Sequence, residues 1–441
     1  MLSSTGADVR KKDFLLVTIV AVMLMSTCGG GGGPACPGKL YNAPSLYVLG
    51  NYVYASFYSK TKSLNPGDAS CPTNTNPYDL SFAKSTDGGN TWTSTIVKAA
   101  ISTTADPTEM FSQTISADPS NTNRIYISYI DSSHNLFCAA SSDGGRTWSS
   151  SRVETVQHMT AVGHALSTDA SGSVYILYTA LDVTNPGAPT ATLKSAKSTD
   201  FGVTWTLATA DPAIGTGFYP SLAIDSSNIV YACYYYRQTF GGLRCISSAN
   251  GVTWGSPINV KIDNTLSGVF SSVAVAPGAV YVAFYNPGSY TVLPGGGIVE
   301  NKNGTLQLMQ SVNSGISYSG LVTVDSNTYT GRAPSMAVNA NFVYIAYGLL
   351  QDEGAPDMRL KFASSINSGA AFTVRSAELG TGVAITDNVY GPNYLSSSLK
   401  YSTSNGIGKL YLMLVDDGGS TLVFQTSSDN GSTWGSKNLS L

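Results

Sequence analysis

The stretches STDGGNTW (85–92), SSDGGRTW (141–148), STDFGVTW (198–205) and SSDNGSTW (427–434) repeat one eight-residue motif, here called the repeat turn. Three further segments keep the motif in altered form, namely SANGVTW from Ser248, SVNSGISY from Ser311 and SINSGAAF from Ser365. The first serines of successive copies lie 56, 57, 50, 63, 54 and 62 residues apart. Self-similarity at such a period is typical of repeat architectures and indicates seven structural units.

The residue types of the repeat turn suit a tight bend. Asp and Asn side chains accept hydrogen bonds from nearby backbone N–H groups, and Gly tolerates a backbone conformation that a side chain disfavours. The acceptor position holds Asp87, Asp143, Asp200, Asn250, Asn313, Asn367 and Asp429. All five tryptophans of the chain lie at the last motif position, where we expect each to be a large buried aromatic.

Short alternating strands surround every repeat turn. In the third unit a small-residue strand HALST (164–168) precedes a Tyr-containing strand VYILYT (174–179), and a strand beginning at Leu193 leads into the turn. A more polar strand follows the turn, and the other six units have the same order. Four strands per unit, repeated seven times over residues 40–441, predict an all-β, seven-bladed β-propeller of four-stranded antiparallel blades in a single domain.

The first residues have the pattern of an export signal. Three basic residues (10–12) precede an apolar run (14–25) that is too short for a comfortable membrane span. Small residues before Cys28 resemble a bacterial lipobox, so we expect residues 1–27 to be a lipoprotein signal peptide and Cys28 to carry lipid. The Gly-rich segment 28–39 would then be a flexible tether at the cell envelope or surface. Secretion without lipid and an uncleaved anchor are the alternatives.

Export permits disulfides. Cys233 and Cys245 lie on consecutive predicted strands that a hairpin would place opposite each other, although two buried thiols are the alternative. Cys36 and Cys71 form a second candidate pair, and Cys138 is expected to be a buried free thiol. The chain has no C-x-x-C pair and no clustered His, so the sequence predicts no metal site and no cofactor.

The repeat turns resemble the Asp boxes, or BNR repeats, of the sialidase-like propeller superfamily, over essentially the whole chain after the signal. The resemblance implies that each turn joins the third and fourth strands of a blade, opposite the active site, so the seven acceptor residues would be structural. Sialidases also need three arginines to bind a carboxylate, with an Arg-x-Pro element near the first strand. Residues 38–60 contain no Arg, and Arg332 lies in an Arg-Ala-Pro element of the sixth repeat, so sialidase activity is not expected.

Ligands of propellers usually bind at the central depression, where the first strands begin and the loops between second and third strands lie. Candidate ligand-binding residues there are Glu109, Phe111, His164, Tyr219, Arg237, Arg332, Asp352 and Tyr394, with Gln113 and Phe270 at equivalent entry positions. Aromatic rings with a few polar groups suit a sugar or peptide surface. The alternative for each residue is a plug of the central opening or a solvated rim position.

A formal charge of −3 gives no electrostatic reason to expect nucleic acid as a partner. The favoured function is an exported module, attached to the membrane only by its lipid, that binds a glycan or protein at the central face. A glycoside hydrolase of the exo-sialidase type, or a lyase, is the first alternative. A structural subunit of a cell-envelope assembly is the second.

Overall fold

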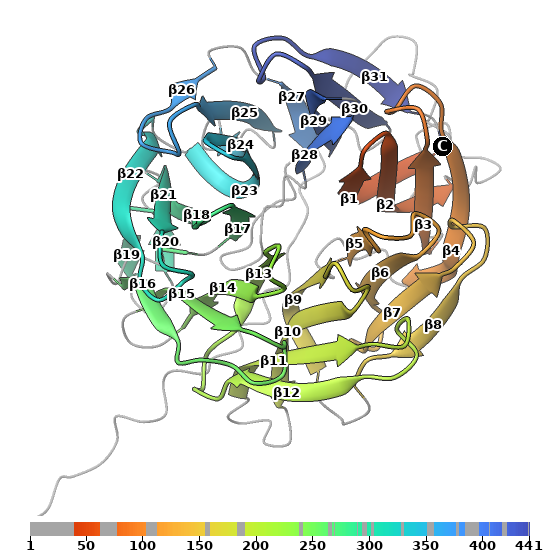
Figure 1. Cartoon of the computed structure of the whole chain (residues 1–441), viewed down its shortest axis with the longest axis horizontal. Coiled ribbons are helices and arrows are strands. Elements are labelled where there is room, and N and C mark those ends of the chain that lie inside the picture. Colours follow the sequence, from red (N-terminus) through yellow and green to blue (C-terminus); the bar gives the residue numbers. More distant parts are fainter. Residues whose placement is uncertain are drawn as a thin grey trace, which may run out of the picture.

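The computed structural model describes residues 39–61, 77–102, 113–154, 159–182, 190–237, 241–262, 267–268, 270–288, 290–292, 298–300, 304–327, 330–350, 357–375, 379–383, 397–404, 406–416, 421–439 and 441. Seven antiparallel sheets surround one axis, which confirms the seven-bladed, all-β propeller (Figure 1). Within these ranges every regular element is a strand, and no helix is long and apolar enough to cross a membrane.

Each of the first four blades is a simple meander whose strands follow the chain order from the axis outward. Blade 1 contains β1 (Lys39–Leu49), β2 (Tyr52–Thr61), β3 (Tyr78–Ser85) and β4 (Thr93–Ser102). Blade 2 contains β5 (Gln113–Ala117), β6 (Ile125–Ile130), β7 (Leu136–Ser141) and β8 (Ser149–Arg152). Blade 3 contains β9 (Met159–Thr168), β10 (Val174–Asp182), β11 (Thr190–Ser198) and β12 (Thr206–Asp211). Blade 4 contains β13 (Phe218–Ile224), β14 (Val230–Tyr236), β15 (Gly242–Ser248) and β16 (Ile258–Ile262).

The last three blades keep this plan with two additions. Blade 5 contains β17 (Ser271–Ala276), β18 (Ala279–Asn286), β21 (Thr305–Ser311) and β22 (Ser319–Asp325), with a hairpin of β19 (Tyr290–Val292) and β20 (Ile298–Glu300) inserted. Blade 6 contains β23 (Thr330–Asn339), β24 (Phe342–Leu350) and β25 (Asp357–Ser365). Its fourth position is shared by β26 (Thr373–Val374) and β27 (Gly380–Val383), which both pair with β25. Blade 7 contains β28 (Ser398–Ser404), β29 (Ile407–Val415), β30 (Leu422–Ser427) and β31 (Gly435–Leu439).

The innermost strands of neighbouring blades touch around the whole ring, although they do not pair as one sheet. Each is therefore an edge strand whose N–H groups need partners. Serine hydroxyls of the preceding blade supply four of them: Ser398 accepts from Leu46 N (3.0 Å), Ser45 from Ile115 N (3.4 Å), Ser272 from Met336 N (3.1 Å) and Ser335 from Leu399 N (2.9 Å). We call Ser45, Ser272, Ser335 and Ser398 the inner serines, and they join successive blades at the axis.

The repeat turn is built as its residue types predict. In the first copy, Ser85 Oγ accepts a hydrogen bond from Gly89 N (2.8 Å) and donates one to Asp87 Oδ1 (2.7 Å). Asp87 also accepts from the main chain (2.9 Å) and the hydroxyl (2.6 Å) of Thr91. These hydrogen bonds, from Thr91 first, hold the pKa of Asp87 well below its ordinary value. The acceptor residue therefore fixes the bend and is ionised at neutral pH.

Each repeat turn also packs against the preceding blade. A Cβ on Gly89 would overlap the ring of Phe424, one on Gly145 the ring of Phe82, and one on Gly431 the ring of Phe362. The tryptophans of these three turns contact the same rings, as Trp148 does edge-on to Phe82 with 5.2 Å between centroids. These tryptophans are half-buried, so their rings are less buried than the sequence predicted. Their outer edges stay in solvent because each ring covers the rim of the neighbouring blade instead of entering a core.

The ring closes by the same contacts. Trp92 of blade 1 lies edge-on to Phe424 of blade 7, with 5.1 Å between ring centroids. The hydroxyl of Tyr41 donates to the main-chain oxygen of Leu441 (3.0 Å) and accepts from its N–H (3.1 Å). Blades 1 and 7 also share one apolar cluster. Closure therefore needs no strand exchange between the ends of the chain.

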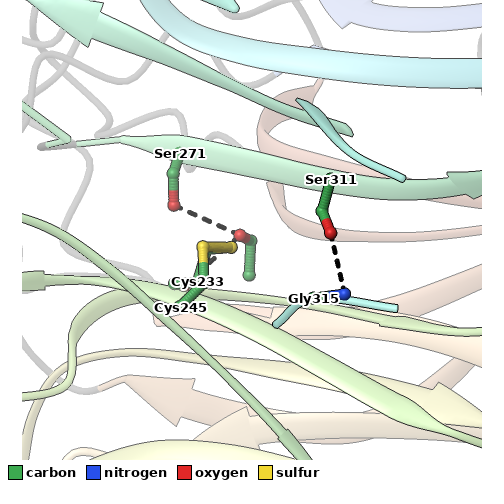
Figure 2. Close-up of a disulfide and its surroundings, with 6 residues drawn as sticks. Cys233, Cys245, Ser271, Ser311 and Gly315 are labelled. Atoms are coloured by element: carbon green, nitrogen blue, oxygen red, sulfur yellow. Dashed lines mark hydrogen bonds between the residues drawn. A yellow bond between two sulfur atoms is a disulfide. The ribbon is translucent and has the colours of Figure 1, made fainter. Parts of the chain in front are cut away.

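A disulfide joins Cys233 of β14 to Cys245 of β15, which face each other in register with a Cα separation of 4.1 Å. Figure 2 shows this bond beside the Ser271 hydroxyl of blade 5, with the repeat-turn bond from Gly315 N to Ser311 Oγ nearby. Cys138 is a buried free thiol, and burial raises its pKa to about 12. Cys28, Cys36 and Cys71 lie outside the described residues.

Packing between blades can be tested with two glycines of one turn. Gly88 and Gly89 both have positive φ (73° and 98°), but a Cβ on Gly88 meets nothing within 4 Å. Both alanine variants should lose about 1 kcal/mol of unfolding free energy because alanine disfavours a positive φ. Gly89→Ala should lose roughly 1–3 kcal/mol more because its Cβ overlaps the Phe424 ring. Denaturant unfolding measures the difference. Equal stabilities of Gly88→Ala and Gly89→Ala would contradict this packing role.

Candidate functional site

The two faces of the propeller differ in what they present. Antiparallel strands place the repeat turns and the turns between first and second strands on one face, as the bond from Gly88 N to Asn51 O (2.9 Å) illustrates. The innermost strands begin on the opposite face, together with the connections between second and third strands. We call this second face the entry face. Of the predicted site residues, His164, Tyr219, Arg237 and Arg332 lie on it, whereas Glu109, Phe111, Asp352 and Tyr394 lie outside the described residues.

In five blades, a residue at or just before the innermost strand has left-handed backbone. It lies two positions before the inner serine, or before the residue that takes the place of the inner serine in that blade. These residues are Ala43 (φ 48°), Gly163 (φ 93°), Tyr219 (φ 51°), Phe270 (φ 59°) and Ala333 (φ 44°). Ala43, Tyr219 and Ala333 coincide with register shifts in the pairing of the first and second strands. Bulky residues rarely adopt positive φ, and such strain is concentrated at functional sites. Five of the seven blades therefore begin at the entry face with a left-handed bend, which is strained at the four positions that carry a side chain.

Two of these bends bring aromatic rings together. Tyr219 of blade 4 and Phe270 of blade 5 lie with 4.9 Å between ring centroids and an interplanar angle of 50°. Both side chains are half-buried. A Cβ on Gly163 of blade 3 would lie 3.9 Å from the Cα of Tyr219, so blade 3 approaches this residue with a glycine. We call Tyr219 and Phe270 the aromatic pair.

His164 has a structural role. It is 7% exposed, and burial lowers its pKa from 6.5 to about 4 despite a hydrogen bond with the main chain of Ser128 in blade 2. Gln113 occupies the equivalent place one blade earlier, where its Nε2 donates to the carbonyl of Ser56 (3.0 Å). Both side chains thus bridge to the second strand of the preceding blade. His164 is neutral at physiological pH and serves the blade interface.

The two entry-face arginines differ in exposure. Arg332 is 6% exposed, and its guanidinium carbon lies 5.2 Å from the centre of the Tyr285 ring, a cation–π contact between blades 6 and 5. Arg237 is exposed at the end of β14, and its N–H donates to the carbonyl of Gly215 (2.7 Å). Arg237 follows the strand that pairs with the one carrying Tyr219, so it borders the blade of the aromatic pair.

Buried carboxylates near the entry face join blades. Asp211, at the end of β12, accepts from the Tyr234 hydroxyl (2.6 Å) and lies 3.4 Å from Arg244. Asp325, at the end of β22, has the same two kinds of partner in the next blade, Tyr347 (2.7 Å) and Lys361 (3.0 Å). Glu154 after β8 pairs with Lys194 at 2.5 Å. The sequence analysis did not predict these contacts. Their signal is a basic residue at the same position of the third strand in three of the blades.

The described residues contain no group of three or more His, Cys, Asp or Glu side chains that could hold a metal ion. What the entry face offers is therefore an aromatic pair, an exposed arginine and polar groups of the inner strands. This combination can hold a ligand by stacking and hydrogen bonding.

The bridging role of His164 gives a test. His164→Ala should lose about 1–3 kcal/mol because the Ser128 carbonyl remains buried without its partner, whereas His164→Gln should be tolerated as Gln113 is. The folded-state pKa lies below the ordinary value, so the unfolded state takes up the proton first. Stability of the parent should therefore fall as pH decreases from 6.5 towards 4, and this slope should vanish in His164→Gln. Denaturation at pH 7 and pH 5 measures both effects, and equal losses in the two variants would refute the bridge.

Solved structures share this architecture. A lectin, BP39L from Burkholderia pseudomallei, superposes with a TM-score of 0.54 at 11% identity, covering 92% of this chain and 99% of its own. A polysaccharide lyase of the ulvan lyase family superposes with a TM-score of 0.53 at 13% identity, covering 89% and 95%. The Trypanosoma rangeli sialidase matches more loosely, with a TM-score of 0.44 at 13% identity over 74% and 54%. No protein-family model and no curated protein sequence matches the chain. These likenesses concern the fold alone: the chain is a seven-bladed β-propeller of antiparallel blades.

Proposed function

We propose that this protein is an exported surface module that binds a glycan at its entry face. The observation that carries the proposal is the aromatic pair, in which Tyr219 and Phe270 from two blades are in contact and only half-buried. Each ring stands on a left-handed backbone residue, a conformation that costs about 1–3 kcal/mol and persists where the surroundings or a function demand it. Aromatic rings can stack on the C–H-rich face of a sugar ring, and they commonly line ligand sites.

A glycan is favoured over a protein ligand because of the two structures with the same architecture. One is described as a lectin and the other as a polysaccharide lyase, so both handle carbohydrate on a propeller of this kind. The proposal transfers only this ligand class to the present chain. The identity of the sugar would depend on side chains that are particular to this entry face.

Binding is favoured over cleavage because the buried carboxylates have structural partners. Asp211 and Asp325 are each held by a tyrosine and a basic residue of the next blade. Most glycosidases need two carboxyl groups at the scissile bond, one of them free to donate a proton, and sialidases use a tyrosine nucleophile beside a carboxylic acid. His164, a further candidate acid or base, is buried and hydrogen-bonded to the main chain of Ser128. The likeness to the ulvan lyase nevertheless makes polysaccharide cleavage the alternative to test.

Export and lipid attachment are further parts of the proposal. The signal-like residues 1–27 and the lipobox-like position of Cys28 support them from the sequence. The disulfide between Cys233 and Cys245 supports export, since disulfides persist mainly in oxidising compartments. Metabolic labelling with a fatty-acid analogue, compared between the parent and Cys28→Ser, would test the anchor.

The proposed site is tested by Tyr219→Ala. A glycan array first identifies the glycan that the parent binds most tightly. We expect Tyr219→Ala to bind this glycan at least about tenfold more weakly than the parent does, because the stacking surface is lost. The matched control is Phe201→Ala, since Phe201 also has positive φ (63°) and is 45% exposed but belongs to a repeat turn on the opposite face. Calorimetric titration gives the affinities. Unchanged affinity in Tyr219→Ala, or an equal loss in Phe201→Ala, would overturn the site.

Cleavage is tested on the same material. We expect no fluorophore release from a sialoside and no absorbance of unsaturated products from a panel of acidic polysaccharides. Turnover by the parent that is lost in Arg332→Ala would make the hydrolase the better assignment. Formation of unsaturated ends would instead favour a lyase.

A further inference from the structure

The disulfide lies in the same blade interface as the aromatic pair. Tyr219 is the second residue of blade 4, and Phe270 directly precedes the first strand of blade 5. Cys233 and Cys245 are buried in an apolar cluster that also contains valines of β17 and β18 in blade 5. The disulfide therefore belongs to the surface with which blade 4 packs on blade 5, the two blades that the aromatic rings join.

Two serines connect the disulfide to the aromatic rings. Ser221, two residues after Tyr219, lies opposite Cys233 in the pairing of β13 with β14. Its hydroxyl donates to the carbonyl of Cys233 (3.4 Å) and lies 3.2 Å from the hydroxyl of Ser271 in blade 5. Ser271 directly follows Phe270, and Figure 2 shows it beside the disulfide. The contacts thus run from a cysteine strand across the interface to the neighbours of both rings.

Both aromatic residues lie just outside regular strand pairing. The register of β13 with β14 shifts between Phe218 and Ser221, so Tyr219 falls within the shift. Phe270 precedes Ser271, which is the first residue of blade 5 that pairs with β18. The two serines are therefore the nearest residues at which the sheets hold the strained bends of the rings. Residues that contact a ligand keep a fixed geometry only when such supporting contacts hold them.

Blade 4 has a covalent bond at a position where the other six blades have none. The second and third strands of those blades place a buried, unbonded pair there, namely Ser56 with Phe82, Ser128 with Cys138, Leu177 with Ser195, Ala283 with Leu308, Ala346 with Phe362 and Met413 with Phe424. Side-chain packing is therefore sufficient for a blade of this fold. The blade with the additional bond is the one whose innermost strand carries Tyr219.

We propose that the disulfide between Cys233 and Cys245 is a positioning element of the aromatic pair. It fixes β14 to β15, and β14 in turn holds Ser221 and, through it, the serine beside Phe270. A site that is held in its binding geometry before the ligand arrives loses less entropy on binding, and this raises the affinity. The effect on affinity rests on the proposed function, in which a sugar ring stacks on the pair. The effect on the rings is a property of the protein alone.

Two variants remove the disulfide and keep the interface filled. Cys233→Ala/Cys245→Leu copies the pair Ala283 and Leu308, which blade 5 uses at the same position. Cys233→Ser/Cys245→Ser changes the side-chain volume least and provides a second route if the first variant folds poorly. The matched control is Cys138→Ala, which removes a buried sulfur at the equivalent position of blade 2 without breaking a bond.

The first experiment uses no glycan. The proteins are labelled with fluorotyrosine, and the fluorine resonances that disappear in Tyr219→Phe and Tyr41→Phe are assigned to those residues. We expect the Tyr219 resonance to shift or broaden when the disulfide is absent, and that of Tyr41, between blades 1 and 7, to stay in place. Both should stay in place in Cys138→Ala. A Tyr219 resonance that changes no more than that of Tyr41 overturns the positioning role.

The second experiment measures affinity for the glycan that the array selects. Titrations are made at a temperature at which every variant is folded, so a lower stability alone leaves the affinity unchanged. We expect the variants without the disulfide to bind about tenfold more weakly than the parent, and Cys138→Ala to match the parent. Parent-like affinity without the disulfide, or an equal loss in Cys138→Ala, would contradict the proposal.

Tyr219→Ala keeps this proposal distinguishable from the proposed function. Normal glycan binding in Tyr219→Ala refutes the proposed binding site, and the fluorine resonances still decide whether the disulfide positions the rings. Loss of binding in Tyr219→Ala with parent-like binding in the variants without the disulfide supports the site and refutes the positioning role. Loss of binding in both supports both proposals.

Discussion

The propeller depends on the contact between a glycine of each repeat turn and a side chain of the preceding blade. A four-stranded sheet has two apolar faces and cannot bury either alone, so every blade needs a neighbour on both sides. At Gly89, Gly145 and Gly431 the missing side chain leaves room for a phenylalanine ring of the neighbour. The serine and aspartate of the same turn hold the glycine where that ring requires it. One motif thus shapes a bend and joins two blades.

The two faces of the propeller hold neighbouring blades together by different kinds of contact. The repeat turns join blades on one face by apolar contact, whereas the entry face joins them by polar groups. Asp211 and Asp325 receive partners from the next blade, and His164 and Gln113 reach back to the previous one. A buried ion pair contributes little net stability, but removal of one partner is costly. The entry-face carboxylates are therefore better understood as parts of the blade interfaces than as free catalytic groups.

Strain and charge that these interfaces do not need are found near the axis. Tyr219 and Phe270 have left-handed backbone although their side chains disfavour it, and Lys400 of β28 places an ammonium where the other six innermost strands have uncharged residues. The left-handed bend itself recurs in five of the seven blades, so the departures from the repeat are the aromatic rings that it carries in blades 4 and 5 and the ammonium in blade 7.

The sequence by itself determined the blade number, the order of strands and the chemistry of the turns. These properties are local and repeated, so the spacing of Ser, Asp or Asn, Gly and an aromatic residue in seven copies was sufficient evidence. It also placed His164, Tyr219 and Arg332 at the start of innermost strands. Only the tertiary structure decided what these residues do, because their partners come from another blade about one repeat away. The contacts between His164 and Ser128, between Tyr219 and Phe270, and between Arg332 and Tyr285 each cross a blade boundary. The residues of a motif specify the hydrogen bonds within its own turn. The burial and the charged neighbours of a side chain near the axis depend instead on how seven separate segments of the chain come together.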